Sequence, residues 1–373
     1  MRLRKDNGNV NVFLIILIVI ASAFIIFMLN NSSTTVKESK IEDKNSIEDD
    51  KVSFNYNTKN LETKNDTQAS AKLSNEILSD SGSSAINNSE VTTDGYNRYF
   101  YSQLTPTGKS MYNTILKNRS TLIDGYGSID LNINEENADK YFQTTWDALT
   151  LDNPDLFFID TKKISLVTRT SSSLLFGKVK YSYILQPQNT GNYFVDTWQT
   201  SDEVKNAVEK INQRTENIIA TAPRTRVDKI KYIHDYLINN MEYNQSDDKN
   251  NGDIYGALIK GKAVCEGYAK AFKYFMDKLD VPCVIVFGKG EDEQGNSEFH
   301  AWDYVQLDNG EWYAVDCTWD DPIIIGNGRV SDKVKYKYFL VGSDSFFTSH
   351  FEDPDVSGSG QNFKYPVISK TNY

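Results

Sequence analysis

The sequence predicts an α+β protein whose main domain packs a helix, beginning at Cys265, on an antiparallel sheet. Two observations predict this core. Apolar residues recur every three or four positions after Cys265, which is typical of a half-buried helix. Residues 298–307 and 311–316 alternate with period two on either side of an Asn309-Gly310 turn, which is typical of a β-hairpin. We expect a smaller α+β domain, a transmembrane helix and a disordered tether to precede this core.

The N-terminal apolar run extends from Val12 to Leu29 and is long enough, as a helix, to cross a bilayer. Arg2, Arg4 and Lys5 precede it, so we expect residues 1–9 to be cytoplasmic and 10–29 to be a single-pass cell-membrane anchor, with the rest of the chain outside the cell. The alternative is a cleaved signal peptide, because Ala21-Ser22-Ala23 resembles a cleavage site. The apolar run continues past this site and is longer than a usual signal core, which favours the anchor.

Residues 30–94 are mostly Ser, Thr, Asn, Lys, Asp and Glu. Such a segment cannot bury enough apolar surface to offset the entropy of its chain, so we expect a disordered linker that tethers the folded part to the membrane. The formal net charge is −11 and the pI is about 4.9, and no basic stripe is present. This composition argues against nucleic acid as a partner.

The segment 95–222 is predicted to be the N-terminal α+β domain. Its expected elements are a helix starting at Thr105-Pro106, a helix 135–149 capped by Asn134, strands 156–168 and 174–186, and a helix 201–220. No cluster of reactive side chains lies in this half. We therefore expect it to serve packing or substrate presentation.

The segment 223–373 is predicted to be the catalytic domain. Pro223 separates it from the preceding helix, and a helical pattern follows over 226–240. His234 lies on or beside the apolar face of this helix, so we interpret it as a core histidine. Three cysteines are too few for a disulfide scaffold, and Cys283, in the apolar run 281–287, is expected to be a small core residue.

Cys265 begins the next helix, and a helix N-terminus carries partial positive charge that favours a thiolate. A structural cysteine is the alternative for a lone thiol. Gly261 and Gly267 flank the position and permit close approach of backbone or substrate. With His300 and Asp316 following it in the chain, Cys265 has a proton carrier and a group that orients that carrier, which favours a nucleophile.

The turn of the hairpin decides whether His300 and Asp316 share a face of the sheet. A two-residue Asn309-Gly310 turn would place them on opposite faces. A three-residue loop 308–310 with Gly310 left-handed would pair Trp302 with Asp316 and bring His300 to the same face. We predict the three-residue loop or an equivalent bulge.

These residues permit nucleophilic acyl transfer, with Cys265 attacking an amide carbonyl, His300 carrying the proton and Asp316 fixing the imidazole tautomer. The backbone N–H of Cys265 is a ready oxyanion donor. Tyr255, Trp302 and Trp319 are weaker candidates for lining the substrate or oxyanion site, and packing explains each of them equally well. No cofactor is expected, and no metal either, because the cysteines and histidines lack ligand-type spacing.

The segment from about Asp228 to Pro322 resembles the transglutaminase-like superfamily, which has a papain-like cysteine fold. The matching motifs are Lys231-Tyr-Ile-His-Asp-Tyr-Leu237 with Tyr243, Gly261-Lys-Ala-Val-Cys-Glu-Gly-Tyr-Ala269, His300-Ala-Trp302 and Val315-Asp-Cys-Thr-Trp319. The resemblance puts the family's Cys, His and Asp on Cys265, His300 and Asp316, and the anchored arrangement is similar to bacterial surface members. The chain departs from animal transglutaminases in two respects: no tryptophan lies upstream near Tyr255, and 247–258 does not fit a calcium loop.

The leading hypothesis is therefore a cell-surface cysteine acyl-transfer enzyme acting on protein or cell-wall peptide amides, with hydrolysis and transamidation both open. A non-catalytic surface binding module that uses the papain-like groove is the alternative. His350, in an aromatic segment, is the alternative general base should His300 lie elsewhere. The oligomeric state is left open.

Overall fold

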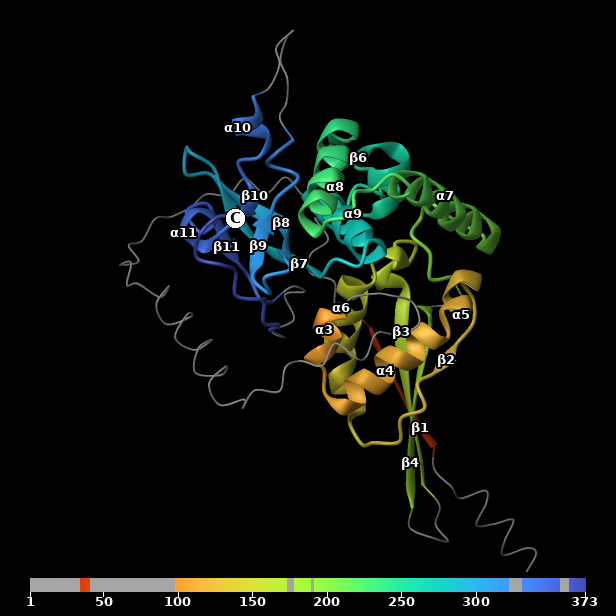
Figure 1. The fold of residues 1–373 in the computed structure, drawn as a ribbon. Coiled ribbons are helices and arrows are strands. Elements are labelled where there is room, and N and C mark those ends of the chain that lie inside the picture. Colours follow the sequence, from red (N-terminus) through yellow and green to blue (C-terminus); the bar gives the residue numbers. More distant parts are fainter. Residues whose placement is uncertain (1–33, 41–97, 173–177, 189–190, 322–330, 356–361) are drawn as a thin grey trace, which may run out of the picture.

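The computed structural model describes residues 34–40, 98–172, 178–188, 191–321, 331–355 and 362–373. Figure 1 shows a part built from helices and a long β arm, and a second part in which helices lie beside a curved sheet. The predicted anchor at 10–29 lies outside the described residues. Among the residues that are described, no helix is long and apolar enough to cross a membrane.

The helices of the first part are short and pack around the base of the arm. They are α3 (Tyr99–Ser102), α4 (Pro106–Lys117), α5 (Arg119–Asp124), the 3₁₀ turn η1 (Ala138–Tyr141), α6 (Phe142–Asp152), and the 3₁₀ turns η2 (Pro154–Leu156) and η3 (Thr161–Lys163). Helix α4 begins as predicted, because the Thr105 hydroxyl accepts the Gly108 N–H and Pro106 occupies the first turn.

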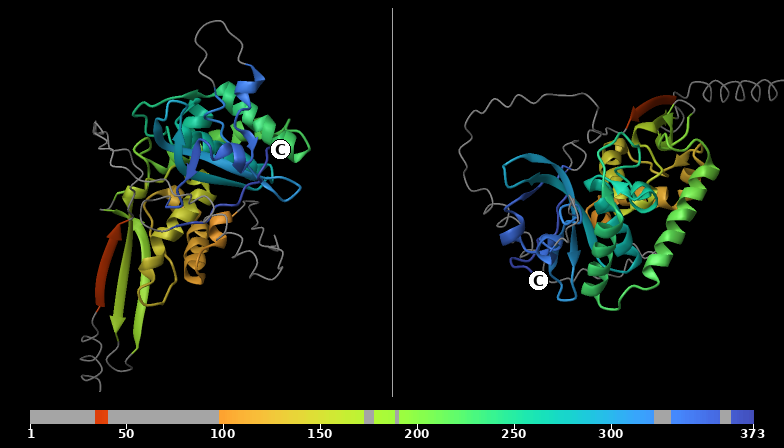
Figure 2. Two further views of the ribbon diagram at one scale, coloured as in Figure 1. Left: turned by 90° about the vertical axis from the view of Figure 1, so that its left-hand side faces the viewer. Right: turned by 90° about the horizontal axis from the view of Figure 1, so that it is seen from above.

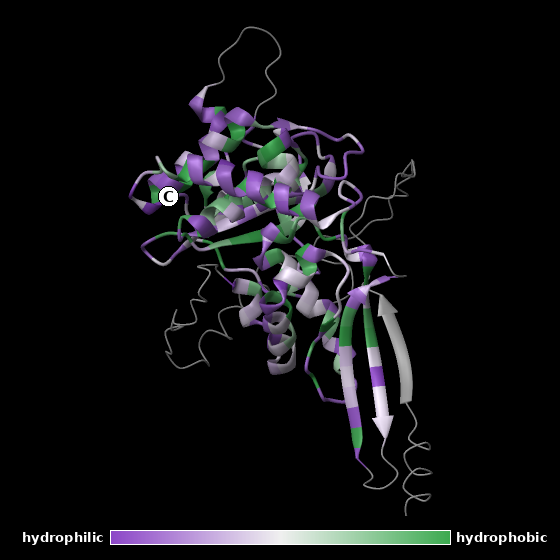
Figure 3. Ribbon diagram, turned by 90° about the vertical axis from the view of Figure 1, so that its right-hand side faces the viewer, coloured by the Kyte–Doolittle hydropathy of each residue, from purple (hydrophilic) through white to green (hydrophobic). Residues whose placement is uncertain are grey.

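The arm is a four-stranded antiparallel sheet in the order β1-β3-β4-β2. Its strands are β1 (Thr34–Lys40), β2 (Ile129–Asp130), β3 (Ile164–Ser172) and β4 (Val179–Pro187). The inner half of β3 is buried and the outer half is partly exposed, and the left view of Figure 2 shows the outer half projecting from the body. Figure 3 shows hydrophobic residues concentrated in the inner half of β3 and β4.

Strand β1 lies in the segment that the sequence predicted to be a disordered linker. It pairs along β3 from Thr34↔Ser171 to Lys40↔Ser165. An exposed strand edge offers unpaired backbone donors and acceptors to any extended segment, whatever its side chains, so composition did not signal this pairing. The other residues of the predicted linker, up to 94, lie outside the described part of the chain.

Two predicted boundaries in the first part are wrong. The helix expected over 135–149 begins later, at η1 and α6, and the Asn134 side chain accepts the Tyr181 N–H instead of capping a helix. The strand expected from 156 begins at Ile164, because the turns η2 (Pro154–Leu156) and η3 (Thr161–Lys163) come before it. In both places tertiary contacts outweigh local propensity.

The second part contains three long helices and a five-stranded antiparallel sheet in the order β10-β9-β8-β7-β11. The helices are α7 (Ser201–Ile219), α8 (Arg226–Asn240) and α9 (Cys265–Lys278); the strands are β7 (Cys283–Glu291), β8 (Ser297–Gln306), β9 (Trp312–Val315), β10 (Phe339–Val341) and β11 (His350–Glu352). Short elements complete it: β5 (Glu242–Tyr243), the π-helical turn Gly256–Lys260, β6 (Lys262–Ala263), α10 (Asp332–Lys335) and α11 (Ser343–Phe346). The three long helices match their predicted ranges within two residues.

Helix α9 contacts strands β7 and β8 of this sheet. Its side of the sheet carries Ala301, Asp303 and Val305, while Trp302 and Tyr304 face a second cluster that includes Phe346 of α11. The larger apolar cluster runs without a break from the first part of the chain into the second. The two predicted domains therefore share one continuous core.

Candidate active site

Cys265 is the first residue of α9, and its side chain is almost buried, with 7% of its surface exposed. The strand β6 just before it pairs in parallel with β5, which places Tyr243 opposite Ala263. Gly267 is required on the first turn, because a Cβ there would lie 2.5 Å from the Asn251 carbonyl oxygen and 2.6 Å from the Ala263 Cβ. The close approach predicted at Gly267 is thus present, and it fixes the start of the helix.

The hairpin β8–β9 has the predicted three-residue loop. Gln306 pairs with Trp312 and Asp303 with Val315, the Leu307 N–H donates to the Glu311 carbonyl, and Gly310 has a φ of +82°. This register puts Asp316 opposite Trp302, and therefore on the same face as His300. The His300 Nε2–H donates to the Asp316 Oδ2 over 2.7 Å. The two residues therefore share a face of the sheet, as the three-residue loop predicts.

His300 lies between the thiol and the carboxylate, with 2% of its surface exposed. Burial opposes its protonation, but the charge and hydrogen bond of Asp316, together with the hydrogen bond and charge of Cys265, raise the pKa of His300 to about 10. Because Asp316 engages Nε2, Nδ1 is the nitrogen that can face the sulfur. His300 therefore donates to Asp316 and is under the electrostatic influence of Cys265, the three residues that the sequence predicted to act together.

The Asp316 carboxylate is fully buried and receives four hydrogen bonds. Its Oδ2 accepts from His300 and from His350 Nε2 at 3.1 Å, and its Oδ1 accepts the backbone N–H groups of Thr318 at 2.9 Å and Trp319 at 3.1 Å. Burial alone would raise the pKa of Asp316, but the imidazoles of His300 and His350 hold it well below its usual range. The carboxylate therefore stays ionised and fixed in orientation.

His350 does not take the place of His300. Its Nε2 is engaged by Asp316 and its Nδ1 lies 2.9 Å from the Ser349 hydroxyl, so both ring nitrogens have partners other than the thiol. Sequence reasoning considered His350 only as an alternative base. Its contact with Asp316 depends on the pairing of β11 with β7, which no local pattern signals.

The three weaker candidates fall into two groups. The Tyr255 ring packs against Phe157, at 6.1 Å between centroids, and Trp198, at 5.3 Å, in the first part of the chain, so packing explains it. Trp302 is buried on the His300 face, and Trp319 lies half-buried with its ring 5.1 Å from His300 and 4.5 Å from His350. Trp319 is thus the one of the three that both borders the histidines and reaches the surface.

Tyr243 lies on β5, opposite Ala263 of the strand that precedes Cys265, and sequence reasoning assigned it no role. Burial and then the charge of Cys265 raise the pKa of its hydroxyl. Its ring is half-buried and lies 6.5 Å from Tyr268 of α9. Its place in the family motif could be recognised from the sequence. The pairing of β5 with β6, the strand before Cys265, could not.

A second His–Asp pair holds the loop that carries Asp316. His234 is fully buried, as predicted for a core histidine, and its Nε2 lies 3.1 Å from the Asp320 Oδ2. The Asp320 Oδ1 accepts the Tyr338 N–H, and the Tyr338 carbonyl accepts the Asp316 N–H. His234 of α8 is thereby connected, through Asp320 and then Tyr338, to the backbone N–H of Asp316.

His300, Asp316 and His350 are also the group of described residues whose ligand atoms all lie within 4.8 Å of one another, as a metal site requires. The same Nε2 and Oδ2 atoms already form the two hydrogen bonds described above. A cation at this place would have to displace both ring protons, so the arrangement fits proton transfer better than metal binding.

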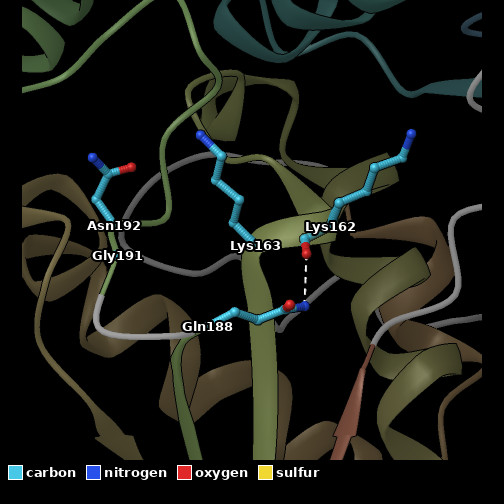
Figure 4. A pocket seen from close by; sticks show the side chains of 5 residues that line it. All are labelled: Lys162, Lys163, Gln188, Gly191 and Asn192. Carbon is cyan, nitrogen blue, oxygen red and sulfur yellow. Dashed lines mark hydrogen bonds between the residues drawn. The ribbon is translucent and has the colours of Figure 1, made fainter.

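A cavity of about 340 Å³ lies in the first part of the chain, away from these residues. Figure 4 shows its lining, with the Gln188 amide donating to the Lys162 carbonyl. The ammonium of Lys163 is paired with Asp196 at 2.6 Å. None of the residues that line this cavity belongs to the site around Cys265.

Comparison with known proteins assigns a family to part of the chain. Residues 212–317 match the transglutaminase-like superfamily, so this region is a transglutaminase-like domain, and it contains Cys265, His300 and Asp316. No curated protein matches the chain.

Solved structures give weaker similarities. A crystal structure of a TGase is 17% identical with a TM-score of 0.30, over 43% of this chain and 46% of that one. A candidate cysteine protease from Cytophaga hutchinsonii is 15% identical with a TM-score of 0.26, over 43% of this chain and 59% of that one. Both TM-scores lie below 0.5, so the family match over 212–317 is what identifies the domain.

Proposed function

We propose that the chain is a cysteine enzyme that transfers the acyl group of an amide through a thioester. The observation that carries the proposal is the position of His300, which interacts with Cys265 on one side and donates to Asp316 on the other. Nucleophilic catalysis by cysteine needs a thiol, an imidazole that contacts it and a carboxylate that orients the imidazole.

In the first half-reaction the Cys265 sulfur attacks the carbonyl carbon, and the C–S bond forms as the C–N bond breaks. His300 holds the thiol proton and delivers it to the departing amine. The Gly267 and Tyr268 N–H groups donate to the carbonyl of Val264, the N-cap residue of α9. The N–H of Cys265, at the first position of the helix, has no acceptor within the helix and can donate to the oxyanion. In the second half-reaction water or an amine attacks the carbonyl carbon of the thioester while His300 takes its proton. The new C–O or C–N bond forms as the C–S bond breaks, the proton returns from His300 to the sulfur, and an acid or a new amide is released.

The substrate and the place of action are part of the proposal. We take peptide amides of proteins or cell-wall peptides as the substrate class, because the resemblance over 228–322 is to enzymes of this chemistry. The apolar run 12–29 with basic residues before it supports a membrane-anchored chain with its catalytic domain outside the cell. The alternative, a surface binding module, has no need of a carboxylate that orients His300.

The test uses the full-length chain with amide-containing peptides and a tagged amine. Incorporation of the tag indicates a transferase, and loss of the amide without incorporation indicates a hydrolase. Cys265→Ala should abolish either reaction, while Cys283→Ala, at a fully buried strand position, should retain it. Absence of both reactions, together with binding that survives Cys265→Ala, would favour the binding module.

A further inference from the structure

His350 is a polar side chain enclosed by aromatic rings. It is fully buried, its ring stacks on Phe346 at 4.0 Å, and the rings of Trp319, Trp302 and Tyr338 lie 4.5 to 5.1 Å away. An apolar side chain could fill such a place without the cost of burying a polar ring. The hydrogen bonds of its two ring nitrogens therefore indicate why a histidine, and not an apolar residue, occupies this position.

Those hydrogen bonds define one tautomer. A carboxylate only accepts, so the nitrogen that faces Asp316 Oδ2 at 3.1 Å, Nε2, must carry a proton. With Nε2 protonated, a neutral ring has a lone pair on Nδ1, which accepts from the Ser349 hydroxyl at 2.9 Å. In this form His350 stabilises the carboxylate without placing a second positive charge beside His300, whose ring centroid is 5.6 Å away.

We propose that His350 is a positioning residue of the acyl-transfer site, whose Nε2–H holds the Asp316 Oδ2 in the orientation that receives the His300 Nε2–H. The two backbone N–H groups from Thr318 and Trp319 fix only the other oxygen of the carboxylate. His350 lies on β11, and β11 pairs with β7 and not with the strands that carry His300 and Asp316. Strand β11, at the edge of the sheet, thereby holds Asp316, the carboxylate that orients His300. This inference rests on the proposed function.

The experiment compares His350→Gln with His350→Asn in the full-length chain. Both replacements are carboxamides, but the Gln amide nitrogen reaches about as far as Nε2 and can donate to Asp316, whereas the Asn amide nitrogen reaches about as far as Nδ1, beside Ser349. The readout is the rate at which iodoacetamide alkylates Cys265 at pH 6, located by peptide mapping. We expect the Gln variant within about threefold of wild type and the Asn variant slower by about tenfold or more, since loss of alignment in a catalytic group has effects of this order.

Equal rates in the two variants, whether slowed or not, would overturn the positioning role, since packing alone would then account for His350. His300→Gln separates this failure from failure of the proposed function. If His300→Gln does not slow alkylation, the thiol is not activated by His300 and the proposed function fails. If it does slow alkylation while His350→Asn does not, only the positioning role fails.

A measurement on the wild-type chain covers the case in which the Asn variant does not fold. Nitrogen-15 spectra of labelled histidines report the tautomer of each ring. We expect His350 with a protonated Nε2 and an unprotonated Nδ1. The opposite tautomer would contradict the proposal, because Nε2 could then donate nothing to Asp316.

Discussion

At the scale of single residues, the site depends on the charge of Asp316. This carboxylate is buried, receives four donors and holds the ring of His300, which in turn interacts with Cys265. Removing one partner of such a buried pair leaves the other without compensation, which costs far more than losing an exposed ion pair.

Asp316→Asn should destabilise the fold by about 3–5 kcal/mol in a pH-dependent way. The pKa of His300 is raised from 6.5 to about 10, so its contribution is complete below pH 6.5 and is lost as the pH rises through about 10. The lowered pKa of Asp316 makes its contribution complete above about pH 3.8 and lost at lower pH. The difference between wild type and variant should therefore be largest between pH 4 and 6.5, measured by urea unfolding.

Asp308→Asn is the matched control, because Asp308 lies on the same hairpin with 75% of its side chain exposed, in an ion pair with Arg226. It should change the free energy of unfolding by less than about 1 kcal/mol. A loss for Asp316→Asn that is no larger than this would contradict the assignment of a buried, functional ion pair.

At the scale of elements, two glycines place the thiol and the hairpin by different physical means. Gly267 allows the Asn251 carbonyl and Ala263 to lie against the first turn of α9. Gly310 has open space around its Cβ position but a left-handed φ of +82°, so only its conformation matters.

Gly267→Ala should therefore reduce both stability and the alkylation rate of Cys265, because the added methyl group pushes β6 and the start of α9 apart at a cost of about 1–3 kcal/mol. Gly310→Ala should cost about 1 kcal/mol of stability and leave the alkylation rate unchanged. Unfolding curves and alkylation rates on both variants check this. Equal effects on alkylation would show that the close contact at Gly267 does not position the thiol.

The hairpin was predictable because its evidence is local: period two in both strands, and a glycine at the one left-handed position of the loop. The helix that begins at Cys265 was predictable for the same reason. The pairing of β11 with β7, and hence the contact of His350 with Asp316, joins segments with no shared pattern. The cap predicted at Asn134 failed because its side chain instead bonds Tyr181 of a strand far along the chain.

At the scale of the whole molecule, α9 connects the site to the first part of the chain. Cys265 lies at its start, and further along the Lys273 ammonium, fully buried, binds the Asp277 carboxylate at 2.5 Å. The charge of Lys273 also acts on Asp152 of α6, which accepts the N–H groups of Phe100 and Tyr101 in α3. Helix α3 is thus connected, through Asp152, to the helix that carries Cys265.

This buried connection should make the stability of the whole fold depend on pH. Burial raises the pKa of Asp277 from 3.8 to about 7, although Lys273 opposes the shift. Its contribution to stability is therefore complete below pH 3.8 and is lost as the pH rises through about 7. Asp277→Asn cannot titrate, so wild type should lose stability relative to this variant between pH 4 and 7, measured by urea unfolding. A difference that does not vary with pH would contradict the raised pKa.

The rate of Cys265 alkylation by iodoacetamide from pH 4 to 10, in wild type and in His300→Gln, reports whether His300 ionises the sulfur. A sulfur that shares its proton with His300 should react below neutral pH in wild type and lose that reactivity in the variant. Identical profiles in the two proteins, with reaction only at alkaline pH, would show that His300 does not activate Cys265.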